Sequence, residues 1–461
     1  MISLTFHGAA QTVTGSKYLL EIDGEKVLID CGVFQGPKEL RLRNWEPAPF
    51  DAKDLKWLVL THAHTDHIGF IPRLYKWGFR GKVLCSAPTR KLAEILLYDA
   101  AHLHEEDARF LNKKKATKHS PALPLFTTEE VKAVLKHFHA VRRGDDYKLS
   151  DAISFEYQDA GHILGARSII VNLRDGQRDV RLLFSGDVGR FDVPLISAPH
   201  RAVDCEYLII ESTYGDRLHP DTDPLEALAD LVHRIVDSGG VLLIPAFAVG
   251  RSQQLVHMLR RLEMDGRIPT LPIHVDSPMA IDATEIFCEF PDQHRVDLSG
   301  GNGSACLLYG DNITYHRSKE SSQAINPLPG PRIIISSSGM LTGGRILHHL
   351  IHRMGDPRNI IALAGYQAHG TRGRDLVEGK QFLRFHGRQH EVKAEVVSLT
   401  GLSGHADYSE LMQWASGISV PPQRSFITHG EPEPAEAMGN RLKTERGFSV
   451  HLPTLGEQVE L

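Results

Sequence analysis

The sequence is poor in cysteine, in long apolar runs and in any excess of charge. Its 461 residues include only five cysteines and no C-x-x-C, so neither a disulfide framework nor a thiolate zinc site is expected. The longest apolar run, Val241–Val249, is much shorter than the ~18 residues of a membrane helix, and no membrane partner is expected. The 52 Lys+Arg nearly balance the 57 Asp+Glu, which argues against a general nucleic-acid coat. The first residues lack the basic start and apolar core of a signal peptide, so we expect a cytoplasmic location.

Histidine is the abundant residue, with 26 copies, and it directs attention to metal chemistry. Short apolar runs predict strands over the first 35 residues and again over about 153–210. Between them, helices are expected over about 68–77 and 128–139. Beyond Glu211 strands and helices alternate, as in a parallel sheet with helical crossovers. One such helix should begin at Asp223-Pro224, with aspartate as N-cap and proline in the first turn. Residues 299–328 are rich in glycine and serine and fit no element.

The segment THAHTDH, residues 61–67, follows the short apolar strand predicted at Trp57–Leu60. It places three imidazoles and one carboxylate within six residues, and a loop leaving a strand end can turn them toward one point. Neutral imidazole and carboxylate are the ligands expected for zinc or a similar divalent ion. The segment therefore predicts a metal site made by His62, His64, Asp66 and His67.

Two later fragments also place a polar residue beside glycine just after a predicted strand. AGHILGA contains His162, and FSGD contains Asp187. Alone, His162 would more often be a hydrogen-bonded core histidine and Asp187 a turn residue. Their order and spacing after the first segment favour metal ligation.

Together, THAHTDH, AGHILGA and FSGD resemble the motifs of the metallo-β-lactamase superfamily. The resemblance implies a centre for two Zn²⁺ ions, in which Asp187 bridges both ions. One ion would be held by His62, His64 and His162, and the other by Asp66, His67 and a later histidine. The same scaffold hosts lactam, thioester and phosphodiester hydrolysis, so the substrate has to be argued from the rest of the chain.

The downstream motifs are similar to those of the β-CASP family of nucleases. ESTYG begins at Glu211, LSGHAD contains His405 and THGE contains His429. By this resemblance the three residues correspond to motifs A, B and C, and a histidine in motif C is typical of the RNA-processing branch. His429 would then be the missing zinc ligand. The resemblance implies a zinc-dependent ribonuclease acting on single-stranded RNA, similar to the shorter bacterial and archaeal relatives of the pre-mRNA 3′-end cleavage endonuclease.

The expected mechanism follows from a two-metal centre. Two metal ions can share one hydroxide, which attacks phosphorus in line with the departing oxygen. Asp66 is expected to orient that nucleophile as well as to bind metal. His405 is the candidate donor of a proton to the leaving oxygen, and Glu211 would hydrogen-bond His405 and keep it cationic.

Two turns in the downstream half place arginine beside glycine. Gly250-Arg251-Ser252 and Gly343-Gly344-Arg345 lie at expected helix N-termini, which favour anions. We predict phosphate contacts from Arg251, Ser337, Ser338, Gly339 and Arg345. The alternative is that the glycines are ordinary caps and that the arginines are solvated.

The expected fold is α/β, an αββα metallo-β-lactamase sandwich with an inserted α/β β-CASP domain. The sandwich would comprise residues 1–205 plus 390–461, and the insert residues 206–389. A homodimer is one possible assembly. Alternatives are a hydrolase of a small ester, thioester or lactam, which has no need of Glu211 and His405, a single-stranded DNA nuclease, and an inactive scaffold subunit.

Overall fold

The structure is a computed structural model that describes residues 2–115, 119–176, 178–298, 306–365, 367, 370–385 and 387–461. Contacts divide the chain into unit 1, residues 1–218 and 404–461, and unit 2, residues 219–403. The boundaries expected from the sequence, after residues 205 and 389, both lie earlier in the chain. No helix among the described residues is long and apolar enough to cross a membrane.

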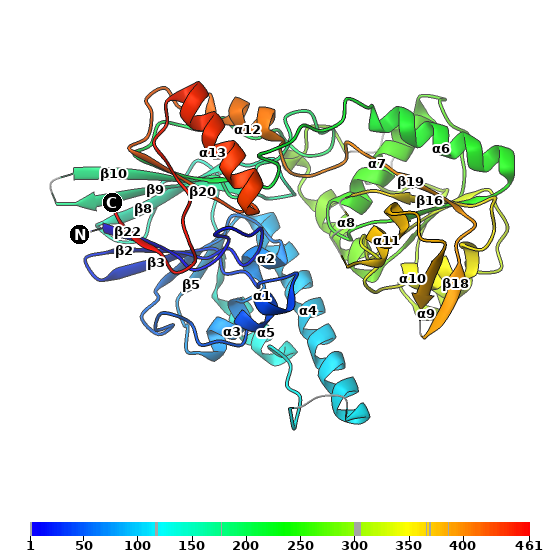
Figure 1. Cartoon of the computed structure of the whole chain (residues 1–461), viewed down its shortest axis with the longest axis horizontal. Helices are drawn as coiled ribbons and strands as arrows, with labels where there is room; N and C mark the ends of the chain where they lie inside the picture. The colour runs from blue at the N-terminus through cyan, green and yellow to red at the C-terminus, as the bar shows by residue number, and fades with distance from the viewer. Residues whose placement is uncertain are drawn as a thin grey trace. The chain divides into compact units, whose positions relative to one another are not determined.

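Unit 1 contains two sheets (Figure 1). The first has the strand order β22 (Gln458–Glu460), β1 (Ile2–Phe6), β2 (Tyr18–Ile22), β3 (Glu25–Ile29), β4 (Trp57–Val59), β5 (Lys82–Cys85) and β6 (Phe138–Ala140). The second has the order β21 (Val450–His451), β20 (Arg424–Thr428), β11 (Tyr207–Glu211), β10 (Arg178–Phe184), β9 (Arg167–Asp175), β8 (Ile153–Asp159) and β7 (Tyr147–Lys148).

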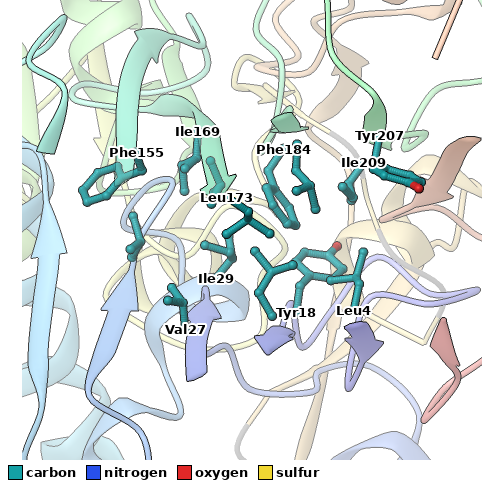
Figure 2. Packing of buried hydrophobic residues seen from close by; sticks show 14 of the residues in the cluster. Leu4, Tyr18, Val27, Ile29, Phe155, Ile169, Leu173, Phe184, Tyr207 and Ile209 are labelled. Atoms are coloured by element: carbon teal, nitrogen blue, oxygen red, sulfur yellow. The ribbon is translucent and has the colours of Figure 1, made fainter. Parts of the chain in front are cut away.

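The core of unit 1 lies between these sheets. Strand β8 buries every second residue, as a strand with one core face should. Its Phe155 and Phe184 of β10 meet Leu4 and Ile29 from the first sheet (Figure 2). Each such fully buried side chain contributes about 1.5–3 kcal/mol. This shared apolar layer fixes the two sheets face to face.

Helices cover the outer faces of both sheets. On the second sheet, Leu208 and Ile210 pack against Trp414 of α12 (Tyr408–Ala415) and Met438 of α13 (Pro432–Arg446). The other helices of unit 1 lie on the first sheet's side in Figure 1. They are α1 (Lys38–Arg43), α2 (Thr65–Ile68), α3 (Ile71–Lys76), α4 (Ala87–Lys114) and α5 (Thr128–Val134). The layers therefore run helix, sheet, sheet, helix.

Two helices expected in unit 1 differ from the observed elements. The helix expected near residues 68–77 is two short helices, α2 and α3, and Pro72 lies in the first turn of the second. Proline has no N–H and therefore favours a new helix start over continuation. The helix expected at 128–139 ends at Val134, because residues Phe138–Ala140 pair with β5 as the strand β6.

Unit 2 is built on one parallel sheet with helical crossovers. Its strand order is β14 (Ile313–Tyr315), β13 (Ile273–Asp276), β15 (Arg332–Ser336), β12 (Val241–Pro245), β16 (Ile360–Leu363) and β19 (Glu395–Ser398). Its helices are α6 (Pro224–Ser238), α7 (Arg251–Met264), α8 (Pro278–Glu289), α9 (Lys319–Gln323), α10 (Ile346–Arg353) and α11 (Arg372–Val377). A hairpin joins β17 (Phe382–Phe385) to β18 (Arg388–Glu391). Asp223 caps α6 as expected, because its carboxylate accepts the N–H of Leu225.

Strand pairing explains the later unit boundaries. Strand β11 pairs with β10 and β20 of unit 1, although it follows residue 205. Strand β19 pairs with β16 of unit 2, although it follows residue 389. Part of residues 299–328, which fitted no element, forms β14 and α9, and residues 299–305 lie outside the described part.

A buried chain of polar groups crosses unit 2. Arg332 Nη1 donates to His274 Nε2 at 3.0 Å, His274 Nδ1 lies 2.9 Å from His316 Nε2, and His316 Nδ1 lies 2.6 Å from Ser321 Oγ. Because Arg332 can only donate, His274 must accept there and donate to His316. This geometry requires a neutral His274, and burial with nearby His316 and Arg332 lowers the pKa of His274 to about 4.

Unit 2 also contains a disulfide that the sequence did not suggest. Cys288 of α8 is bonded to Cys306, 18 residues later. The expectation of no disulfide, based on scattered cysteines, is therefore wrong for this pair. Cys31, Cys85 and Cys205 are free and buried.

Candidate metal centre

The polar motifs lie where strands of unit 1 end. Strands β10, β11 and β20 are parallel, and β8 has the same direction because it and β10 both pair antiparallel with β9. Their carboxyl ends therefore share one edge of the second sheet. His162, Asp187, Glu211 and His429 follow or end these strands, and the segment 61–67 follows β4 of the facing sheet. Sequence positions far apart thus meet at one edge of the sandwich.

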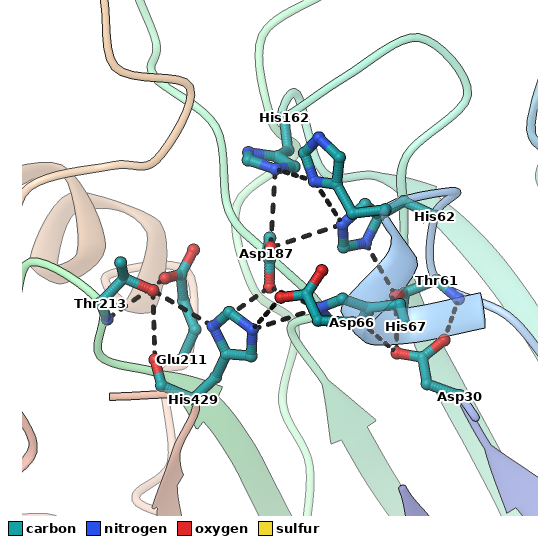
Figure 3. Close-up of polar contacts among 12 residues, drawn as sticks. Asp30, Thr61, His62, Asp66, His67, His162, Asp187, Glu211, Thr213 and His429 are labelled. Atoms are coloured by element: carbon teal, nitrogen blue, oxygen red, sulfur yellow. Dashed lines mark hydrogen bonds and ion pairs between the residues drawn. The ribbon is translucent and has the colours of Figure 1, made fainter. Parts of the chain in front are cut away.

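The first group of candidate ligands consists of His62, His64, His162 and Asp187, whose donor atoms lie close together. Figure 3 shows His62 and His162 turned toward Asp187. Nδ1 of His64 lies 3.0 Å from Nε2 of both His62 and His162. Oδ2 of Asp187 lies 3.4 Å from Nε2 of His62 and 3.5 Å from Nε2 of His162. We call these four residues the first pocket.

The second group consists of Asp66, His67 and His429, with the other oxygen of Asp187. Nε2 of His67 lies 3.2 Å from Nε2 of His429 and 3.3 Å from Oδ1 of Asp187. Oδ2 of Asp66 lies 3.4 Å from Nε2 of His429. We call these the second pocket, and Asp187 faces both pockets with one oxygen each.

Hydrogen bonds on the outer side of three rings fix their tautomers. Nδ1 of His67 lies 2.7 Å from Asp30 Oδ2, and Nδ1 of His162 lies 2.9 Å from the carbonyl of Gly404. Both partners only accept, so these Nδ1 atoms donate. Nδ1 of His62 lies 3.0 Å from the hydroxyl of Thr61, which donates to Asp30 and so accepts from His62. The inner Nε2 atoms therefore present lone pairs to the pockets.

This donor set fits two divalent cations. Ring nitrogens of neighbouring histidines lie 3.0–3.2 Å apart, close to the spacing of two ligands on one cation. Nitrogens about 2.0–2.1 Å from a tetrahedral Zn²⁺ would be separated by about 3.3 Å. Oδ1 of Asp187 is buried and accepts no hydrogen bond from the described residues, so this oxygen is available to bind a metal ion. Burial holds the pKa of His62 and His162 well below the ordinary value, which favours the neutral ligand form.

His405 and Glu211 form a separate pair beside the pockets. Nδ1 of His405 lies 3.3 Å from Oε2 of Glu211 and 4.0 Å from Oδ2 of Asp187. Burial opposes charge on the His405 ring, but the Glu211 carboxylate outweighs it and raises the pKa of His405 to about 9. Glu211 is itself held by the N–H of Val188, which donates to Oε1 at 2.5 Å. A cationic imidazole beside the two candidate pockets can donate a proton.

Asp30 and Thr61 are outer groups that sequence reasoning missed. Asp30 accepts from His67 and from both the N–H and the hydroxyl of Thr61, at 2.7–2.8 Å. Asp30 has a φ of +57°, which few residues other than glycine adopt. A signal was present, because Asp30 directly follows a buried strand and precedes Cys31-Gly32, as the motif residues follow theirs.

The phosphate contacts expected from the sequence all lie in unit 2. Nη1 of Arg345 donates to Asp276 Oδ1 at 2.7 Å and to the carbonyl of His316 at 2.8 Å. The hydroxyl of Ser338 accepts from the N–H groups of Thr342 and Gly343. The other expected contacts are placed as follows: Ser337 donates to Ser277 Oγ, Arg251 donates to Gln254, and Gly339 lies against Phe247. These groups have partners inside unit 2, so their binding of phosphate stays a prediction.

Three family models match separate parts of the chain. Residues 12–199 match the metallo-beta-lactamase superfamily, residues 252–376 the Beta-Casp domain, and residues 389–453 the Zn-dependent metallo-hydrolase RNA specificity domain. The three matches follow the order of the motifs described above.

Curated relatives match over nearly the whole chain. Ribonuclease TTHA0252 of Thermus thermophilus is 35% identical over 459 residues, which cover 98% of each protein. Probable RNase MJ4 of Methanocaldococcus jannaschii is 31% identical over 467 residues, covering 100% of each. Transcription termination factor FttA of the same organism is 31% identical over 446 residues, covering 93% of this chain and 67% of that protein. A solved protein of unknown function from Enterococcus faecalis shares the fold, with a TM-score of 0.57 and 16% identity over 100% of both chains.

Proposed function

The chain belongs to the β-CASP family of the metallo-β-lactamase superfamily, and from this premise we propose that it hydrolyses RNA phosphodiester bonds at two zinc ions held by unit 1. The family and the fold class expected from the sequence are thereby confirmed. With ribonuclease-named relatives at full length, the chain is a metal-dependent RNA nuclease. The finer proposal is carried by one observation, the convergence of seven ligand side chains on two points beside His405.

Zinc is the proposed metal because the pockets offer imidazole and carboxylate without thiolate. When bound, two such ions would supply an activated water at neutral pH and would neutralise charge on the phosphoryl oxygens. The protein's part is to hold Asp187 between the pockets and to orient the rings through Asp30, Thr61 and Gly404. Asp66, at the rim of the second pocket, is placed to orient the nucleophile.

His405 supplies the proton that the leaving oxygen requires. It is no member of either pocket, yet its ring centroid lies 4.4 Å from that of His162 and its side chain is 21% exposed. Glu211 accepts from Nδ1 and so orients the ring. A positioned acid of this kind contributes about 10²- to 10⁴-fold to a rate.

The proposed partner is single-stranded RNA. The relatives named as ribonucleases and the family match to an RNA specificity domain support RNA over the alternatives of a small ester, a lactam or DNA. A role in RNA processing or decay, a cytoplasmic location and contacts from Arg251, Ser337, Ser338, Gly339 and Arg345 are further parts of the proposal. A homodimer stays a prediction that solution mass measurement would test.

The test compares substrates on the zinc-loaded chain. End-labelled single-stranded RNA should be cleaved, whereas DNA of the same sequence, a thioester and a β-lactam should not. His405→Ala should keep both metals by elemental analysis and lose about 10²- to 10⁴-fold in rate. His102→Ala, at an exposed position of α4, is the matched control and should cleave normally. Full activity of His405→Ala would refute the acid assignment, and thioester cleavage without RNA cleavage would refute the substrate.

A further inference from the structure

We infer that Thr213 is a positioning residue for the second pocket and that its hydroxyl decides which nitrogen of His429 faces the metal. The inference deepens the proposed function and rests on the two-metal centre. Thr213 Oγ1 donates to the carbonyl of His429 at 3.1 Å and lies 3.2 Å from Nδ1 of the same residue. A hydroxyl has one proton, and we assign it to the shorter contact, with the carbonyl that can only accept, so the oxygen accepts at Nδ1. Nδ1 of His429 therefore carries its hydrogen.

The opposite nitrogen of His429 then presents a lone pair to the second pocket. Nε2 lies 3.2 Å from Nε2 of His67 and 3.4 Å from Oδ2 of Asp66 (Figure 3). Nδ1 also lies 3.5 Å from Oδ1 of Asp187, a longer contact than the one to Thr213. If the hydrogen moved to Nε2, an N–H would point into the pocket and exclude a cation. The Thr213 hydroxyl prevents that tautomer.

Thr213 also supports a strained backbone. His429 has a φ of +49°, in the left-handed region that non-glycine residues seldom occupy, and such strain gathers at functional sites. The N–H of His429 donates to the carbonyl of Ala9 at 2.7 Å, and its carbonyl accepts from Thr213 and, at 3.4 Å, from the N–H of Ser212. One side chain thus holds both the ring and the peptide of this ligand.

The two pockets depend on different outer groups, which makes the inference specific. In the first pocket His62 and His162 donate to Thr61 and to the carbonyl of Gly404. Within the described part of the chain, the Thr213 hydroxyl contacts His429 and no ligand of the first pocket. Loss of this hydroxyl should therefore weaken the second metal and spare the first.

The experiment measures metal affinity on the full-length chain. Thr213→Val has nearly the same shape but no hydroxyl, and it should bind one Zn²⁺ as the wild type does and the other about 10- to 100-fold more weakly. Thr213→Ser keeps the hydroxyl and should restore both affinities. Thr222→Val, where the lost hydroxyl pairs with Thr400 in unit 2, is the matched control and should bind two metals normally. Chelator competition with elemental analysis gives affinity and stoichiometry without an activity assay.

Several outcomes decide the matter. Wild-type affinity for both metals in Thr213→Val, or a Thr213→Ser variant as weak as the valine variant, would overturn the inference. If the valine variant does not fold, Thr213→Ala tests the same loss. Excess Zn²⁺ should return RNA cleavage to Thr213→Val, because a positioning role is exerted through the metal. A wild type that binds two metals without cutting RNA would overturn the proposed function and leave this inference intact.

Discussion

Replacing Glu211 by glutamine should move the alkaline limb of the pH–rate profile to lower pH. A general acid works only while protonated, so kcat/KM falls as pH rises through its pKa. Burial alone would lower the pKa of His405, and the nearby carboxylates, led by Glu211, instead raise it from 6.5 to about 9. At about 1.4 kcal/mol for each pKa unit, that is about 3 kcal/mol in favour of the cation.

Glutamine keeps the shape of Glu211 and removes the charge. Its carbonyl can still accept the N–H of Val188, so the turn after β11 should keep its fold. Burial then dominates the ring of His405, and the limb should move down by about two pH units. Bound cations lower the limb in both proteins alike, so the difference between the two profiles is the predicted quantity.

The assay is kcat/KM for single-stranded RNA between about pH 6 and about pH 10, with metal content measured for each protein. Glu46→Gln, at an exposed position of unit 1, is the control and should follow the wild type. The two proteins should agree at the acid end, where His405 is protonated in both. An unchanged alkaline limb in a Glu211→Gln variant that retains both metals would refute the reasoning.

Three further predictions concern metal binding and stability. Asp30→Asn places an amide donor against Nδ1–H of His67, so the metal in the second pocket should bind about 10- to 100-fold more weakly. Chelator competition measures the affinity, and an unchanged value would contradict the role of Asp30. The pKa of His274 is lower in the folded protein than in the unfolded chain, so lowering the pH from about 6.5 to about 4 should reduce the free energy of unfolding by up to about 3 kcal/mol. After correction for intrinsic exchange rates, hydrogen exchange in peptides from β13 should be slower at neutral pH than at about pH 4. Cys288→Ser removes the disulfide to Cys306 and should lower the free energy of unfolding of unit 2 by about 3 kcal/mol. Urea titrations followed by circular dichroism measure this loss, and equal stability of variant and wild type under oxidising conditions would count against the crosslink.

Most of the candidate metal centre could be predicted from the sequence because its proposed ligands come in local groups. Four of the seven ligands lie within residues 62–67, and His162 and Asp187 each stand beside glycine at a strand end. Such spacing needs no tertiary information. His429 was different, since only a family resemblance connected it to His67, which lies 362 residues earlier.

Other features depended on partners that no local pattern reveals. Residues Phe138–Ala140 read as the end of a helix, and they form a strand only because β5 offers an unpaired edge. Arg345 stood at a promising helix N-terminus, yet its guanidinium binds Asp276, which is 69 residues away. Cys288 and Cys306 looked unrelated for the same reason. Strand pairing, buried ion pairs and disulfides depend on tertiary contacts, and the local sequence does not show which partner each residue will have.

The place of β20 between β11 and β21 in the second sheet has a consequence for protein synthesis. This strand pairs with β11 in register from Tyr207↔Arg424 to Glu211↔Thr428, and it delivers His429 to a pocket whose other ligands were translated long before. A polypeptide still attached to the ribosome, ending before Arg424, lacks both that strand and a complete second pocket. All residues up to His429 must therefore have been translated before the second pocket can be completed.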